Sequence, residues 1–416
     1  MAFTRSDVER ISSDHSEPAW LREARLSSWE LFEGMPMPDS SKDEDWRRTD
    51  VSKLDLAAYT ASANGAGQPV LNAPAELPKG VIFCTLEEAV RQYPDLVREH
   101  LGGDGNKFAA LNAALWTGGV FVYIPPDVQL EVPLGASHPG VGASALFPRT
   151  LIVVERGAAL TFIDRFAGLD QRPGTPRAEA MLSSASTQVV VREAARLEYV
   201  SLQERGEQTW HFARECATVA RDGRVDFVVA ALGALLSKSY VETILNGPGS
   251  EANLVGVVLT DGTQHIDHQT LQDHRAPHTT SNLLLKSAVK GHSQSIFAGL
   301  VRMPKEAQQS DAFQEARALL LSEYAKADAI PKLEIVANDV RCTHAGAIGQ
   351  VDAEQKFYLQ SRGIPEREAE RLIVTGFFEP ALERIPVEAV RESTRAALQA
   401  RLSLDSAPSP SRRGLG

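Results

Sequence analysis

Short apolar runs and alternating apolar and polar residues dominate the middle of the chain, from about residue 115 to 349. Alternation with a period of two is typical of β-strands that bury one face. Many runs form a unit of an apolar strand, a tight polar or glycine turn, and a second alternating strand. Five segments show this unit: 151–164, 189–201, 218–230, 244–258 and 287–301. The pattern predicts a mainly β core.

The turns of these five units are unevenly spaced, at Gly157, Ala194, Gly223, Gly249 and Gly291. Intervals of 37, 29, 26 and 42 residues fit stacked β-units with loops of variable length better than a strict short repeat. The scarcity of helical pattern between them argues against a doubly wound α/β fold. Two architectures remain open from the pattern alone: antiparallel hairpins in a meander or sandwich, or a coiled parallel stack, which is a β-helix or solenoid.

The N-terminal part of the chain carries a helical pattern instead. A stretch at 18–31 places apolar residues on one helical face and ends before Pro36 and Pro38, which cannot continue a helix. The segment 60–80 is rich in alanine, glycine, asparagine and proline, and we expect it to be a linker. We assign 1–114 to an N-terminal helical and mixed region.

The C-terminal part also predicts helices. Asp352 with Gln355 has the form of a capping box at the start of one helix, and Pro365 suits the first position of a second, which we expect Pro380 to interrupt. The last residues are too polar and proline-rich to fold. The remaining regions are therefore a β-helix or hairpin core at 115–349, a C-terminal helical region at 350–403 and a disordered tail at 404–416.

Composition narrows the function classes. The chain has 43 Lys and Arg residues against 54 Asp and Glu, a net charge of −11, which argues against a nucleic-acid partner because phosphate binding needs a basic face. No apolar run approaches the roughly 20 residues of a membrane span, and the first residues lack the apolar core of a signal peptide. Cys84, Cys216 and Cys342 are too few for a disulfide framework. We expect a cytoplasmic protein without membrane contact.

Common catalytic motifs are missing from the sequence. The chain has no Walker A phosphate loop, no G-x-S-x-G elbow, no H-E-x-x-H helix and no C-x-x-C pair. A cubane iron–sulfur cluster usually takes four thiolates. Three dispersed cysteines could therefore hold such a cluster only with ligands from another chain.

Cys342 and His344 lie in the short segment that carries the most candidate chemistry. Two residues apart on an extended chain, they point to the same face, where thiolate and imidazole could ligate one metal or cluster. The same proximity could lower the pKa of the thiol and make it a nucleophile. The alternative is a small buried cysteine at the end of a strand, with a histidine that is only hydrogen-bonded.

A second cluster contains four of the ten histidines, His265, His268, His274 and His278, interleaved with Asp267 and Asp273. These residues could build a mononuclear metal site. The period of two on a strand separates them instead, because His265 and Asp267 share one face and His268 lies on the other. Polar ladders on stacked β-units would give the same pattern.

The C-terminal third resembles a known family. The segment C-T-H-A-G-A-I-G at 342–349, with P-K-L-E-I at 331–335 before it and F-Y-L-Q-S-R-G at 357–363 after it, is similar to the signature of the SufB/SufD iron–sulfur cluster assembly proteins. The resemblance spans roughly 110–390. Within the family, the N-terminal segments and the length of 416 residues are most like SufD.

By position, Cys342 and His344 match the family's interface cysteine and histidine, and the family's histidine is implicated in cluster assembly with a cysteine of SufB. One local departure follows them. Ala345, Gly346 and Ala347 stand where the family usually has Gly-Ala-Thr, and we expect this shift to alter the turn after the histidine.

The resemblance implies a right-handed parallel β-helix (the SufBD core) between helical ends. It also implies a complex with SufB, through an edge of the β-helix near 333–344, and with the ATPase SufC, which would dock on the C-terminal helices. The apolar residues expected to form this dock are Phe357, Tyr358, Leu359, Ile373, Phe377 and Phe378.

The predicted function is a SufD-like scaffold subunit of the SufBCD complex that is neither an ATPase nor another enzyme. We expect it to hold no cofactor firmly, and to share iron or a transient iron–sulfur cluster with SufB. The resemblance leaves room for a reduced flavin in the complex. Two alternatives are a SufB-like homomeric scaffold and a β-helix enzyme acting on polysaccharide, which would need a carboxylate-lined cleft and usually an export signal.

Overall fold

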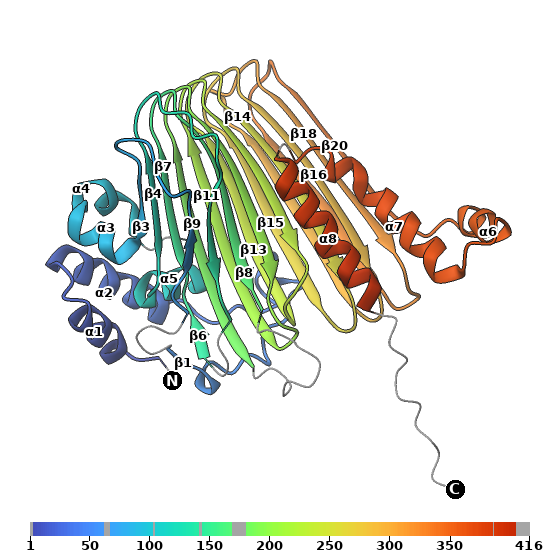
Figure 1. Ribbon diagram of the computed structural model, residues 1–416, viewed down its shortest axis with the longest axis horizontal. Coiled ribbons are helices and arrows are strands. Elements are labelled where there is room, and N and C mark those ends of the chain that lie inside the picture. The colour runs from blue at the N-terminus through green and yellow to red at the C-terminus, as the bar shows by residue number, and fades with distance from the viewer. Residues whose placement is uncertain are drawn as a thin grey trace, which may run out of the picture.

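The computed structural model describes residues 3–61, 67–102, 105–140, 144–168, 180–385 and 387–404. Most of the predicted disordered tail and part of the predicted linker lie outside these ranges. About 42% of the chain is β-strand. Figure 1 shows a long β structure with helices at both ends of the chain. The predicted mainly β fold with helical flanks is confirmed.

Two sheets form the body of the protein. Sheet A contains, in order, β19 (Lys326–Ile335), β17 (Gln294–Met303), β15 (His265–His274), β13 (Leu236–Leu245), β11 (Thr209–Val219), β9 (Met181–Val191), β7 (Arg149–Val154), β4 (Val120–Ile124) and β3 (Ile82–Thr85). Sheet B contains, in order, β2 (Val70–Asn72), β5 (Leu134–His138), β8 (Ala159–Ala167), β10 (Arg196–Glu204), β12 (Arg224–Ala231), β14 (Glu251–Thr260), β16 (Thr280–Val289), β18 (Asp311–Leu320) and β20 (Arg341–Gln350). Two short strands, β1 (Thr60–Ala61) and β6 (Ser144–Leu146), pair beside sheet A. The stretch expected to be a linker thus contributes β1 and β2.

Neighbouring strands of the central region run parallel and in register. Residues 196–203 of β10, for example, pair one to one with 224–231 of β12. Among the described strands, antiparallel pairs occur only near the N-terminal end, between β2 and β5 and between β3 and β4. Because the chain crosses to the other sheet after almost every strand, it coils into a parallel β-solenoid of about seven turns. The predicted β-helix is confirmed, and the central strands do not form the hairpins that the pattern had left open.

The corners that lead from sheet A to sheet B stack into a column. Every such corner before the one between β19 and β20 has one residue with positive φ, and its N–H donates to a carbonyl of the corner in the next turn, as Gly157 donates to Glu193. These hydrogen bonds stabilise a backbone conformation that otherwise favours glycine. The column consists of Asp127, Gly157, Ala194, Asp222, Gly249, His278 and Gln309.

The column corrects the turn spacing expected from the sequence. Gly223 lies one residue beyond the corner residue Asp222, and Gly291 belongs to the opposite edge, between β16 and β17. Along the column, successive corners are 27 to 31 residues apart except between Gly157 and Ala194. That interval contains residues 169–179, which lie outside the described part of the chain. The repeat is more regular than predicted.

The space between the sheets holds the main apolar core, but it also contains polar groups. Core residues from both sheets include Ile152, Leu197, Phe227 and Leu283. Asp164, fully buried among them, accepts hydrogen bonds of 3.0 Å from the hydroxyls of Thr150 and Tyr199, and the Nε2 atom of His138 lies 2.7 Å away. Such buried polar groups are tolerated because they are paired.

Glu215 is a buried carboxyl with an expected effect on stability. It is 3% exposed inside the solenoid, and burial raises its pKa to about 7, although a hydrogen bond from Ser201 opposes the rise. A group with a raised folded-state pKa stabilises the fold at low pH, and this contribution is lost as the pH rises through 7. Glu215→Gln should therefore stabilise the protein above pH 7 by up to about 3 kcal/mol and change little near pH 5. Urea unfolding at both pH values measures this, and equal effects at both would contradict it.

The N-terminal helices cover the outer face of sheet A at the start of the solenoid. They are α1 (Arg5–Asp14), α2 (Ala19–Gly34), α3 (Leu86–Gln92), α4 (Pro94–Val97) and α5 (Lys107–Leu115), with short 3-10 turns at Glu44–Trp46, Leu56–Ala58 and Arg98–His100. Trp29 and Trp116 from this region belong to one apolar cluster with Leu151 and Phe212 of sheet A. This cluster closes one end of the molecule.

The C-terminal helices cover part of the outer face of sheet B. They are α6 (Ala353–Ser361), α7 (Glu366–Leu382) and α8 (Glu388–Leu404), and α6 projects away from the strands in Figure 1. Asp352 caps α6 by accepting the N–H of Glu354 at 2.8 Å, as predicted. Pro380 does not interrupt α7 as expected: it lies two residues before the end of the helix, which continues through it to Leu382, and the proline removes only its own N–H donor. Within the described residues, none of the helices is long and apolar enough to cross a membrane.

Candidate functional site

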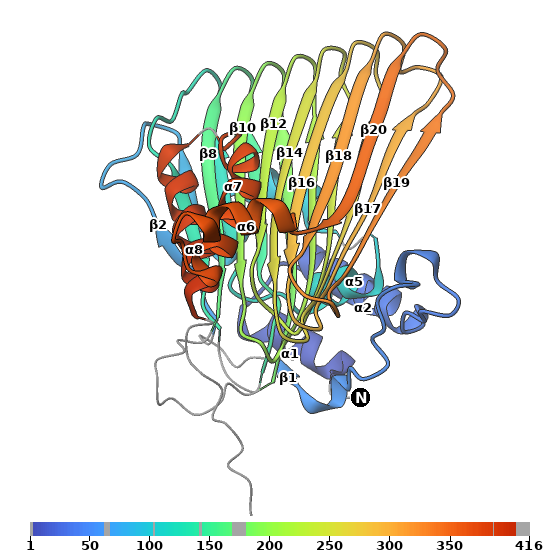
Figure 2. The same cartoon turned by 90° about the vertical axis from the view of Figure 1, so that its right-hand side faces the viewer.

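The two last strands leave one end of the solenoid open. β19 pairs only with β17, and β20 pairs only with β18, so each has an unpaired edge among the described strands. Figure 2 shows both strands at the right-hand side of the stack, away from the C-terminal helices. Large apolar side chains are exposed here, including Tyr324 (60%), Ile335 (40%), Val336 (66%) and Ile348 (46%). We call this surface the open end.

Cys342 and His344 lie on β20 at the open end. In the strand register they sit beside Ala312 and Gln314 of β18, which are buried and face the interior of the solenoid. Both residues therefore point to the interior side, as their spacing predicted. They are uncovered there because no described strand follows β20.

The two side chains differ in their surroundings. Cys342 is half-buried against the small apolar cluster of Val301, Met303 and Ala312, and burial, together with the charge of Asp311, raises the pKa of its thiol. A protonated thiol is a poor nucleophile. His344 is exposed at the open end. An exposed imidazole can ligate a metal or carry a proton near neutral pH.

The histidine cluster does not come together at one site. His265 faces outward from β15, whereas His268 and His274 are buried and face inward, and His278 occupies a corner. Burial lowers the pKa of His268 and of His274 to about 4, so both are neutral at physiological pH. In the described part of the chain, no group of three or more His, Cys, Asp or Glu side chains could hold a metal ion.

The outward residues of this cluster instead fasten the N-terminal region to sheet A. The hydroxyl of Thr49 donates to the carboxylate of Asp267 and lies 3.0 Å from Nε2 of His265. Lys238, fully buried, donates to the same carboxylate at 2.5 Å. A buried ion pair with these additional hydrogen bonds is costly to break. These residues therefore have a structural role.

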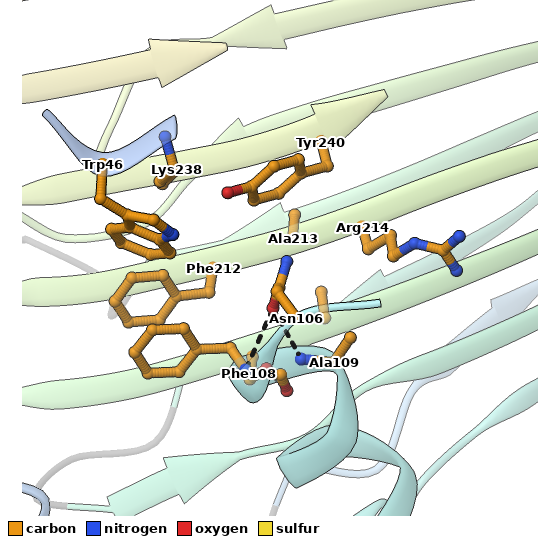
Figure 3. A pocket seen from close by; sticks show the side chains of 11 residues that line it. Trp46, Asn106, Phe108, Ala109, Phe212, Ala213, Arg214, Lys238 and Tyr240 are labelled. Carbon is orange, nitrogen blue, oxygen red and sulfur yellow. Dashed lines mark hydrogen bonds between the residues drawn. The ribbon is translucent and has the colours of Figure 1, made fainter. Parts of the chain in front are cut away.

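Trp46, on the N-terminal segment that also carries Thr49, packs beside the rings of Phe108 and Phe212, which stack with 3.6 Å between centroids (Figure 3). The Nζ atom of Lys238 lies 4.8 Å from the centroid of the Trp46 ring. The cavity left between these side chains measures about 10 Å³, which is room for about one water molecule. The packed rings fix the N-terminal segment on sheet A, and the cavity is too small for a substrate.

A groove on α6 and α7 is the largest concave surface among those described here, with a volume of about 880 Å³. Its walls include Phe357, Tyr358, Leu359 and Ile373. Phe357 is 72% exposed and Tyr358 is 57% exposed, so neither is held by the fold. Exposed aromatic residues in a groove are typical of protein interfaces.

The other two residues expected in the dock lie on the covered side of α7. Phe378 is 1% exposed and packs on Val255 and Leu284 of sheet B. Phe377 packs partly on the same cluster, and its carbonyl accepts a hydrogen bond of 2.6 Å from Lys286. Leu372 of α7, which the sequence-based set left out, is 42% exposed. Helical phase, read from the first residue of α7, could have separated these two faces.

The comparisons with known proteins decide the family. Residues 137–377 match the SufBD core domain of SUF system iron–sulfur cluster assembly proteins, and residues 61–135 match the SufBD N-terminal region. The chain belongs to the SufBD family. The resemblance found in the segment at 342–349 is therefore confirmed, and iron–sulfur cluster assembly is the process in which the chain takes part.

Relatives match this SufBD chain over nearly its whole length. The iron–sulfur cluster assembly protein SufD of Bacillus subtilis is 30% identical over 94% of this chain and 96% of its own. An iron–sulfur cluster assembly SufBD family protein of Staphylococcus haemolyticus is 29% identical over 94% of this chain and 92% of its own. One of Staphylococcus epidermidis is 28% identical with the same coverage.

Ala345, Gly346 and Ala347, which depart from the family pattern, lie in a strand and not in a turn. β20 continues through Gly346, which pairs with Ala316, and ends at Gln350. The shifted glycine lies in the middle of an extended strand, where φ is not restricted to values that need glycine. The expected change after His344 is wrong, and both candidate ligands keep their direction.

Proposed function

We propose that this SufBD protein is a SufD-like scaffold subunit that assembles iron–sulfur clusters together with a SufB-like subunit and a SufC-like ATPase. The observation that carries the proposal is the open end, where Cys342 and His344 lie on the interior side of an unfinished solenoid and no described strand covers them. In this proposal the SufC-like partner hydrolyses ATP, since the sequence of this subunit has no Walker A phosphate loop.

The open end suits a partner of similar architecture. Unpaired strand edges are usually paired or covered in natural proteins because they otherwise aggregate. A SufB-like solenoid could extend sheets A and B across β19 and β20 and bury the exposed Ile335 and Ile348. Such pairing would close the interior side of His344 into a shared interface.

The ligands present suit a cluster that is assembled and passed on. Cys342 and His344 provide at most two ligands, and four are usual for a cubane cluster. The remaining ligands would come from the SufB-like partner, and iron and sulfide are the cargo rather than resident groups. The raised pKa of the Cys342 thiol favours His344 as the earlier ligand.

The groove on α6 and α7 is the proposed dock for the ATPase. Phe357 and Tyr358 are exposed, and Ile373 lines the groove with them. The acidic residues Asp352 and Glu354 stand on its rim. An apolar groove with a charged rim is the usual composition of a transient interface.

Co-expression of this chain with SufB-like and SufC-like proteins tests the proposal. We expect one stable complex that contains all three chains and yields iron and sulfide after anaerobic reconstitution. A chain that forms a complex with itself alone, and loads clusters in that state, would support the homomeric scaffold instead.

Val336→Asp is expected to weaken pairing with the SufB-like subunit at least about tenfold without unfolding the chain. The side chain is 66% exposed at the open end, so the substitution removes no core contact but places a charge in an apolar interface. Val132, which is 52% exposed in the loop before β5, provides the matched control Val132→Asp. Analytical ultracentrifugation of the mixed subunits measures the affinity. Equal affinities for both variants would place the interface elsewhere.

A further inference from the structure

One buried polar side chain lies directly beneath the candidate histidine. Gln314 of β18 pairs in register with His344 of β20, and both face the interior side. Neighbouring strands are about 4.8 Å apart, so two long side chains at paired positions can turn toward each other and come into contact. Gln314 is 1% exposed, whereas His344 is exposed above it.

The side-chain amide of Gln314 has a hydrogen-bond acceptor without a partner among the described residues. Its Nε2 atom donates to the carbonyl of Gly299 at 3.4 Å, and its Oε1 atom is buried without a hydrogen-bond partner in the described chain. Leaving a buried amide oxygen unpaired is unfavourable, so native proteins usually supply a partner. Among the described strands, His344 of β20 is the residue that follows Gln314 in its register column.

The opposite strand makes room for this amide. Gly299 of β17 faces Gln314, and a Cβ atom at Gly299 would lie 2.5 Å from Oε1 of Gln314 and 2.5 Å from the ring of Phe297. Any other residue at 299 would force the amide to move. The absence of a side chain here thus keeps Gln314 in place below the open end.

Cys342 has no comparable support. The residue beneath it is Ala312, which offers no hydrogen-bond acceptor on its side chain. Of the two candidate ligands, only His344 is paired in the strand register with a residue that has a polar side chain. This difference separates the two residues by geometry alone.

We propose that Gln314 is a positioning residue for His344: when the exposed imidazole turns toward the solenoid interior, its ring N–H donates to Oε1 of Gln314, which has no partner in the described part of the chain. The hydrogen bond fixes the tautomer and the orientation of the ring, so the other nitrogen presents its lone pair at the open end. The proposal rests on the proposed role of His344 in holding iron or a cluster. It adds a residue that touches neither.

Three variants separate positioning from packing. Gln314→Leu removes the amide at similar volume, Gln314→Glu keeps an acceptor oxygen at the same distance, and Gly299→Ala displaces the amide from the opposite strand. The isolated full chain labelled with ¹⁵N-histidine reports the tautomer of His344 through its long-range ¹H–¹⁵N spectrum, and His344→Asn assigns the signal. Circular dichroism and unfolding midpoints show that each variant folds.

We expect one dominant His344 tautomer in the wild type, a changed ¹⁵N shift pattern in Gln314→Leu and Gly299→Ala, and its restoration in Gln314→Glu. Iron recovered with the partner complex should fall several-fold in Gln314→Leu and return in Gln314→Glu. A His344 spectrum that Gln314→Leu leaves unchanged would overturn the proposal, even if iron loading fell. If the tautomer changes but iron loading does not, Gln314 still positions His344, and the proposed function of His344 fails instead.

Discussion

Replacing His344 by alanine is expected to lower the iron and sulfide recovered with the assembled complex by at least about tenfold, because even partners of metal ligands typically contribute that much to affinity. The side chain is exposed on β20 and makes no core contact, so the chain should fold and pair with its partners as before. Iron and acid-labile sulfide per complex, measured after anaerobic reconstitution, give the result directly.

A matched pair of variants controls for the loss of any histidine. His278 is also exposed, at a corner with φ of +58°, where asparagine is tolerated. His344→Asn should reproduce the loss of cluster, and His278→Asn should leave the loading unchanged. His268 is a less useful control, because it is 2% exposed and its removal would leave a cavity in the interior. Normal loading of the His344→Ala complex would remove His344 from the site.

The double substitution Phe357→Ala and Tyr358→Ala is expected to weaken binding of the SufC-like ATPase by at least about 30-fold. Aromatic anchors at an interface commonly contribute about 2 kcal/mol or more each. Because Phe357 is 72% exposed and Tyr358 is 57% exposed, their loss should leave the melting temperature almost unchanged. Isothermal titration of the purified ATPase into each variant measures the affinity.

Leu31→Ala serves as the control, since Leu31 is a 43% exposed apolar residue on α2, in the N-terminal region. Deleting 352–402 would be a poorer test. α7 and α8 cover Val228, Val255 and Leu284 of sheet B, so the deletion would expose a broad apolar surface and confuse docking with misfolding. If the double variant bound the ATPase with unchanged affinity, the dock would lie outside the groove.

The local sequence pattern located the strands but could not determine how they pair. The runs around Gly157 and Gly249 predicted two strands with a tight turn, and a tight turn between strands usually means a hairpin. In the structure the same turns lead from one sheet to the other, and pairing occurs with residues about 30 positions away. Periodicity carries no information on such distant partners. The parallel architecture was therefore predictable only from the resemblance.

The sequence likewise predicted only part of the candidate site. The shared face of Cys342 and His344 follows from the period of two along a strand, and the same rule separated the histidines on β15 correctly. Gln314 could not be found in this way, because only the register between β18 and β20 places it under His344. The burial of Phe378 also depends on which face of α7 meets sheet B.

The most direct test of the account is whether His344 of this chain touches the cluster during assembly. The complex would be prepared with ¹⁵N-histidine in this subunit alone, loaded anaerobically, reduced, and measured by pulsed electron paramagnetic resonance. The account predicts a ¹⁵N coupling from a directly bound imidazole, which disappears in the His344→Ala complex. A paramagnetic cluster that shows no such coupling in the wild type, or an identical coupling in His344→Ala, would contradict the account.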